Sequence, residues 1–151
     1  MTDLGKMAAI VIGALAASFL LSHSKAHADT WLSATVASYH GNRDRGYNER
    51  NYGLGFEHDR SATTRWAAGF YENSHYRTTV YGGLLWLPVQ AGPFRFGVLG
   101  SVATGYTHAV TVVPLPTIAV ESRHFGANIG IVPSLHRSIG VIGLQLKAKL
   151  P

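Results

Sequence analysis

The stretch "IGLQLKAKL", residues 142–150, alternates strictly between two kinds of side chain. Bulky apolar residues occupy one parity, and glycine, glutamine and two lysines occupy the other. Such alternation with a period of two is typical of a β-strand whose two faces meet different surroundings. Residues 94–106 and 125–131 repeat the pattern, with aromatic and aliphatic residues on one face and mostly glycine, alanine, serine or asparagine on the other.

The composition of the face without bulky residues distinguishes between two architectures. In a soluble sandwich the face that meets water carries many charges, whereas a membrane barrel turns large apolar residues to lipid and small or polar ones to its lumen. The small, mostly uncharged second face favours the barrel. Eight steps of about 3.3 Å, tilted near 45°, give 142–150 an apolar band of roughly 19 Å, close to the ~25 Å of outer-membrane barrels. A soluble lipocalin-like barrel is the alternative.

The sequence therefore predicts an all-β fold, an eight-stranded antiparallel up-and-down barrel that spans a membrane. Turn-forming glycine, asparagine, aspartate and proline separate its strands. The predicted strands cover residues 30–40, 50–58, 64–73, 76–87, 93–107, 114–121, 124–132 and 138–150. Trp31, Trp66 and Trp86 are candidates for the aromatic girdles at the membrane interfaces. Trp31 is also a candidate, with Arg77 and Tyr81, for a bulky residue that fills the lumen beside its glycines; a cavity for a chain-like molecule is the alternative.

An export signal precedes the predicted barrel. Residues 7–21 form an apolar run behind Lys6, and "AHA" at 26–28 has the small residues of a cleavage site. The run of about fifteen residues is shorter than the roughly 20 that a spanning helix needs. We therefore expect a cleaved signal peptide over 1–28 and a single domain over 29–151, located in the outer membrane.

Composition excludes several kinds of function. The chain has no cysteine, so it has no disulfide, no thiolate chemistry and no cysteine-bound metal. Without Lys6, Lys25 and Asp3 of the signal peptide it has 11 basic and 7 acidic residues, a net charge of +4, which suits an anionic lipid surface. The longest basic cluster is "RDR" at 43–45, so no nucleic-acid partner is expected. The histidines lack ligand-like spacing beside carboxylates, so no metal site is expected.

Several segments resemble a known family in the same order along the chain. They are "RGYNERNYGLGFE" (45–57), "AAGFYENSHYRTTVYGGLLW" (67–86), "GPFRFGVLGSVATGYT" (92–107), "VVPLPTIAVES" (112–122) and "NIGIVPS" (128–134). Together they resemble the PagP family of outer-membrane lipid A palmitoyltransferases and its small exported relatives. The resemblance implies a membrane barrel whose apolar pocket takes one acyl chain from a phospholipid and passes it to a hydroxyl of lipid A, without metal or cofactor.

The implied partners are membrane lipids, namely phospholipid and lipopolysaccharide, and we expect a monomer. A lipid-binding relative without transfer activity is also compatible with the resemblance. The alternatives from other classes are a noncatalytic envelope barrel, such as a phage-derived one, and a soluble periplasmic carrier of an apolar ligand.

Family members place a His, an Asp and a Ser on their outward loops for acyl transfer. Ser74 matches the family Ser, and Asn73 stands where the family has Asp. His40 is the one candidate for the family His, although it lies only seven residues before Tyr47, closer than in the family. The expected roles are a base for His40 and polar partners for Ser74 and Asn73, where the amide orients the imidazole or donates to an oxyanion.

The charged cluster 47–50 is expected at the outer rim, where it meets a lipid headgroup or forms a structural ion-pair network. Pro114 and Pro116 lie within a predicted strand and Pro133 follows one. Each is expected to interrupt strand pairing, because proline has no N–H. In the family such gaps are lateral doorways for lipid, and a strand end or bulge is the alternative. The candidate substrate-binding residues are Tyr47, Asn48, Glu49, Arg50, Arg77, Tyr81, Pro116 and Pro133.

Overall fold

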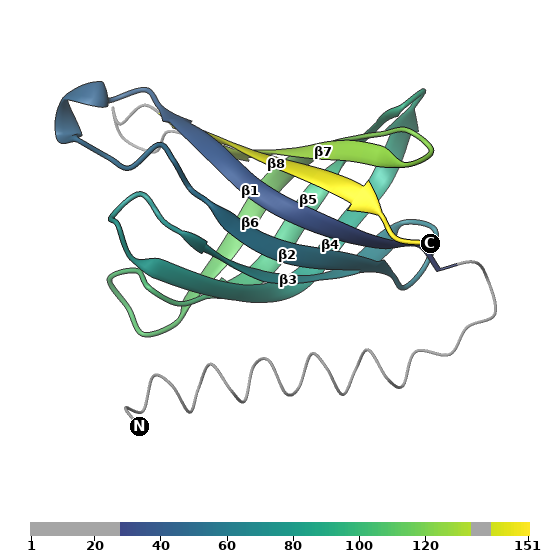
Figure 1. Cartoon of the computed structure of the whole chain (residues 1–151), viewed down its shortest axis with the longest axis horizontal. Helices are drawn as coiled ribbons and strands as arrows, with labels where there is room; N and C mark the ends of the chain where they lie inside the picture. The colour runs from purple at the N-terminus through teal and green to yellow at the C-terminus, as the bar shows by residue number, and fades with distance from the viewer. Residues whose placement is uncertain (1–27, 134–139) are drawn as a thin grey trace.

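The computed structural model describes residues 28–133 and 140–151, which form a closed barrel of eight antiparallel strands in chain order (Figure 1). The first strand pairs with both the second and the last, which closes the sheet. The strands are β1 (Thr30–His40), β2 (Gly53–Asp59), β3 (Thr64–Glu72), β4 (Thr78–Ala91), β5 (Phe94–Ala103), β6 (Thr111–Glu121), β7 (Phe125–Val132) and β8 (Val141–Lys149).

The predicted all-β up-and-down barrel is confirmed. A short 3-10 helix, η1 (Arg43–Arg45), lies between β1 and β2. No helix in the described part of the chain is long and apolar enough to cross a membrane. The predicted signal peptide, 1–28, lies outside the described residues except for its last one.

Strands β2 and β6 each begin three residues away from prediction, at Gly53 and Thr111, and two others differ where the backbone is irregular. β4 continues to Ala91, four residues past its predicted end, because its register with β5 shifts between Trp86 and Val89. Such a bulge lets a strand accommodate an extra residue and continue. β5 ends at Ala103 instead of 107, ahead of Gly105, whose φ of +83° is incompatible with a strand.

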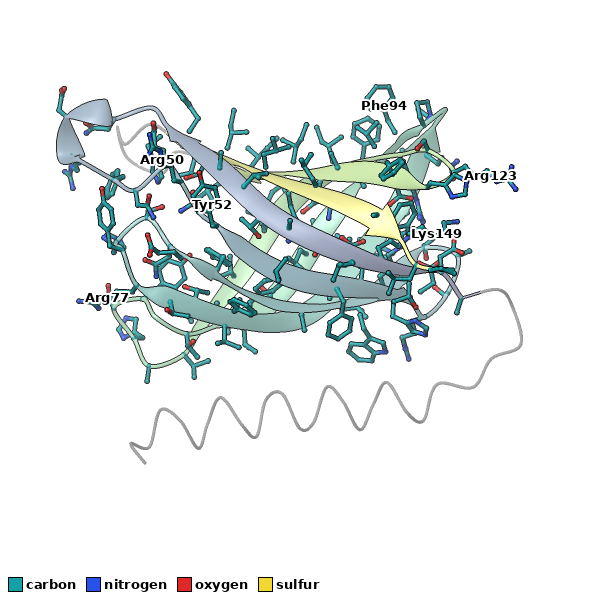
Figure 2. The ribbon with its side chains drawn as sticks, viewed as in Figure 1. Arg50, Tyr52, Arg77, Phe94, Arg123 and Lys149 are labelled. Atoms are coloured by element: carbon teal, nitrogen blue, oxygen red, sulfur yellow. The ribbon has the colours of Figure 1, made fainter. Side chains whose placement is uncertain are left out.

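The two faces of the strands point as the alternation predicts. Ile142 on the outside of β8 is 50% exposed, whereas Lys147 on the lumen side is 4% exposed. Large apolar side chains are likewise exposed on the outside of the other strands, as Figure 2 shows around the barrel. Of the two placements expected for Trp31, the lumen is confirmed and the girdle is not, because Trp31 is only 1% exposed and packs against cations of the lumen.

Charged side chains fill the lumen at the end with the short turns, and we call Glu57, Arg65, Glu121 and Lys147 the floor. The Lys147 ammonium lies 3.0 Å from Glu57 Oε2 and 2.7 Å from Glu121 Oε1. The Arg65 guanidinium lies 3.2 Å from the same Glu57 oxygen and donates to both oxygens of Glu121. The Trp31 ring packs against these cations, 5.2 Å from Lys147 Nζ. Each buried charge therefore has an opposite partner, as burial requires.

The opposite end of the barrel carries the longer connections (Figure 1). Towards this end, β6 and β7 stop pairing at Thr117–Gly130. Glu121 N donates to Pro93 O on the β5 side of β6, so the alternate peptides at Pro114 and Pro116 face β7. Neither proline has an N–H to donate there, which explains why the pairing ends. The expected interruption at Pro116 is confirmed.

The floor predicts a large difference between two lysines of β8. Lys147→Ala leaves Glu57 and Glu121 buried with less counter-charge, and we expect it to lower the free energy of unfolding by about 3–5 kcal/mol. Lys149 pairs with Asp29 at 2.6 Å in a partly exposed place, so Lys149→Ala is expected to lower it by only about 0–1 kcal/mol. Urea unfolding of the barrel in detergent micelles measures both, and equal losses would contradict a structural role for the floor.

Candidate functional site

His40 and Ser74 meet at the end of the barrel that carries the longer connections. His40 is the last residue of β1, and Ser74 lies in the turn between β3 and β4. The Nε2 atom of His40 lies 2.7 Å from Ser74 Oγ, although 34 residues separate them in the sequence. The imidazole is buried, with His40 only 4% exposed. The fold thus joins two of the three predicted catalytic residues.

The segment between β1 and β2 folds back to fix this contact. Its Asn48 N donates to Ser74 O at 3.0 Å, and the Asn48 amide donates to Glu72 Oε1 at 2.7 Å. The Tyr47 ring packs against the imidazole of His40, with 4.7 Å between ring centroids. The Tyr-Asn pair therefore ties the end of β1 to the turn that presents Ser74.

Glu49 lies on the other side of the imidazole. Its Oε1 accepts a hydrogen bond of 3.0 Å from the backbone N–H of His40 and lies 3.9 Å from His40 Nδ1. That ring nitrogen is buried and makes no hydrogen bond with any described residue. The order carboxylate, imidazole, hydroxyl is the arrangement by which an orienting acid and a base activate a hydroxyl nucleophile. Such contacts are often longer before substrate binds.

Asn73 belongs to the turn and does not contact the imidazole through its side chain. Its Oδ1 accepts hydrogen bonds from the backbone N–H of His75 at 2.8 Å and of Arg77 at 3.2 Å. Its Nδ2 donates to Thr79 Oγ1 at 3.0 Å and to Gly105 O at 2.9 Å. Both donors and both acceptor sites of the amide are thus used. In the described contacts the Asn73 amide therefore supports the turn, and it does not orient the imidazole of His40 as expected.

A cavity of about 460 Å³ extends from His40 and Ser74 into the lumen. Its volume lies within the range of about 300–1,000 Å³ that is typical of small-molecule sites. At the end of the cavity near the floor, Gln145 Nε2 donates to Tyr81 OH at 3.1 Å, and Glu57 of the floor also lines the cavity. Its middle is mostly apolar, lined by Ala67, Leu85, Leu99, Ala103, Val113 and Leu115.

The other predicted site residues are more dispersed. Tyr81 lies in the lumen, where its hydroxyl comes within 2.7 Å of the place that a Cβ at Gly55 would occupy. Arg50 and Arg77 are exposed at the loop end of the barrel (Figure 2). Pro133 lines the cavity mouth. Pro116 faces outward on β6, away from the cavity.

Two features of the site have no counterpart in the sequence-based expectations. His75, directly after Ser74, also lines the cavity mouth, and its ring meets the Tyr47 ring edge-on at 5.6 Å. Tyr71 and Tyr106 line the cavity and join their hydroxyl groups at 2.7 Å. The signals were the position of His75 beside the candidate Ser and the lumen parity of Tyr71, but neither residue belongs to a recognisable motif.

Among residues 28–133 and 140–151, no group of three or more histidine, aspartate or glutamate side chains is placed to hold a metal ion. No protein-family model and no curated protein matches the chain.

Proposed function

We propose that this chain is an outer-membrane acyltransferase that moves an acyl chain from a phospholipid to lipid A. The observation that carries the proposal is the 2.7 Å contact between His40 and Ser74 at the mouth of a largely apolar cavity. An acyl chain in that cavity places its ester carbonyl beside a base and a hydroxyl, the groups that acyl transfer requires.

The outer surface of the barrel supports a membrane location. Leu54, Phe70 and Leu146 are about half exposed on three different strands, and in water such a continuous apolar surface would be costly. Exposed aromatic side chains lie near both ends of the strands, as in the girdles of membrane barrels. At the loop end these are Tyr39, Tyr52 and Tyr76, and toward the other end Trp86 and Phe94. A soluble carrier would bury these groups.

The proposed reaction exchanges one ester for another. The Nε2 atom of His40 accepts the proton of the attacking hydroxyl, whose oxygen bonds to the acyl carbonyl carbon. The bond between that carbon and the glycerol oxygen then breaks, and the imidazolium returns the proton to that oxygen. A lysophospholipid leaves, and no metal or cofactor takes part. Glu49 stabilises the imidazolium while it carries the proton.

Ser74 has two possible parts in this scheme. It either attacks first and forms an acyl-enzyme, or it holds the imidazole and the lipid A hydroxyl attacks directly. Both routes use the same proton path through His40. Mass spectrometry of the protein after incubation with phospholipid alone distinguishes them, since only the first route adds an acyl group to Ser74.

The central prediction concerns lipid A in cells that express the chain. We expect the wild type to add one acyl chain to lipid A, and His40→Ala and Ser74→Ala to reduce that product by about 10²–10⁴-fold. His124→Ala, at an exposed position in a turn at the far end, is the control and is expected to keep full activity. Unmodified lipid A in the presence of abundant, folded wild-type protein would reject the transferase.

Glu49 generates a second prediction. Glu49→Gln keeps an oxygen for the backbone N–H of His40 but removes the charge, so we expect transfer to fall roughly 10- to 100-fold with unchanged folding. Glu72→Gln changes another rim carboxylate, one that contacts Asn48 instead of the imidazole. We expect it to lower acyl transfer by less than about threefold. Equal effects of the two variants in the lipid A assay would remove Glu49 from the mechanism.

Gly143 allows the cavity to be filled. It lines the cavity, and a Cβ built there meets nothing within 4 Å. Gly143→Met is therefore expected to leave the barrel stable while it occupies the space of the acyl chain, so that transfer of long chains is lost and transfer of shorter chains remains. Gly143→Ala, with one methyl group, is the graded control. Unchanged chain preference in both variants would place the acyl chain elsewhere.

A noncatalytic lipid-binding barrel is the second candidate. It is favoured by Asn73, which supplies no carboxylate at the position of the family Asp and serves the turn instead. Lipid that copurifies in the cavity of both the wild type and His40→Ala, with lipid A unmodified, would select this function.

A further inference from the structure

A second pocket, of about 380 Å³, lies beside the cavity mouth at the loop end of the barrel. We call it the rim pocket. Ser74, His75, Tyr47, Tyr106 and Arg45 line both the rim pocket and the cavity. The two spaces therefore meet at the residues that surround the His40–Ser74 contact.

The charge of the rim pocket has one sign. Arg45, Arg77 and His75 all line it, and none of the described residues that line it is an aspartate or glutamate. Neither arginine makes an ion pair with any residue of the described chain. This differs from the floor, where every cation has an acidic partner. Two arginines that line one small space suit an anion, because the fork of N–H donors on a guanidinium group matches phosphate.

The pocket is held by bonds between its two walls. Arg45 comes from the β1–β2 connection and Arg77 from the β3–β4 turn. Asn48 N donates to Ser74 O at 3.0 Å across the two segments, and Tyr76 OH donates to Gly46 O at 3.5 Å. Asn73 Oδ1 holds the backbone N–H of Arg77. Arg77 is thus held at its own backbone and Arg45 through its neighbour Gly46 before any ligand arrives, which lowers the entropic cost of binding.

We propose that the rim pocket binds the phosphate group of the lipid whose ester reacts at Ser74. This inference rests on the proposed function. In a glycerophospholipid only the glycerol unit separates the acyl ester from the phosphate, so a chain in the cavity with its carbonyl at Ser74 carries the phosphate into the adjoining space. The phosphate of lipid A offers the same chemistry from the acceptor side. Arg45 and Arg77 then select phosphate-bearing lipids over neutral ones.

The donor arm of the test uses lipids that cannot react. The full mature barrel in neutral maltoside micelles is titrated with a dialkyl-ether glycerophosphate and with the matching dialkylglycerol, and apparent Kd values are measured by native mass spectrometry. We expect the wild type to bind the phosphate-bearing lipid at least roughly tenfold more tightly. Arg45→Gln/Arg77→Gln is expected to lose that preference. Arg123→Gln, an exposed arginine at the far end (Figure 2), is expected to keep it.

The acceptor arm replaces the two lipids by lipid A with and without its phosphates. A preference that the Arg45→Gln/Arg77→Gln variant loses only in this arm assigns the pocket to the acceptor, and one lost only in the donor arm assigns it to the donor. No preference for phosphate in the wild type in either arm, or a preference that survives in the double variant, overturns the inference.

The outcomes separate this inference from the proposed function because the ether lipids are not substrates. Acylation of lipid A that depends on His40 and Ser74, together with no phosphate preference, keeps the transferase and rejects the rim pocket. A phosphate preference that depends on the two arginines, with lipid A unmodified, keeps the pocket and rejects the transferase. Should the double variant not fold, the wild-type comparison alone decides whether phosphate is preferred.

Discussion

An eight-stranded barrel encloses a lumen about one side-chain layer wide, and this constraint governs the whole molecule. At the end with the short turns the layer is complete, because Glu57, Arg65, Glu121 and Lys147 neutralise one another around the Trp31 ring. Beyond it the strands carry mostly small or aliphatic residues, and the space stays open. The charged floor thus sets where the cavity ends, and the loops set what stands at its mouth.

The residues around the mouth of the cavity come largely from the connections between strands. The β1–β2 pairing stops at Thr35–Gly53, and the connection that follows bonds to the β3–β4 turn and to the end of β1. That connection brings Tyr47 and Glu49 against His40 and places Arg45 beside Ser74. The imidazole of His40, the hydroxyl of Ser74 and two arginines therefore lie at one end of the barrel, while the sheet supplies the walls of the cavity.

The fold could be predicted from the sequence because alternation in β8 reports directly which residues face in and which face out, whatever the neighbouring strands are. The contact between His40 and Ser74 was expected only from the family resemblance, since it depends on how residues 41–52 fold back, and no local pattern encodes that path. For the floor, the sequence predicted only that charged residues such as Lys147 face the lumen. It did not show which charges pair with one another. The sequence left two placements open for Trp31, because an aromatic residue near a strand end suits either a membrane interface or a site beside buried cations.

The side-chain amide of Asn73 holds the β3–β4 turn next to Ser74 in its shape. Its amide N–H groups point at the hydroxyl of Thr79 and the carbonyl of Gly105. An aspartate in the same place would set a carboxylate oxygen against that carbonyl, with acceptor facing acceptor and no proton between them. An acid at position 73 is therefore expected to loosen the turn that presents His75 and Arg77, so a charge gained there would also reshape the loop end of the barrel.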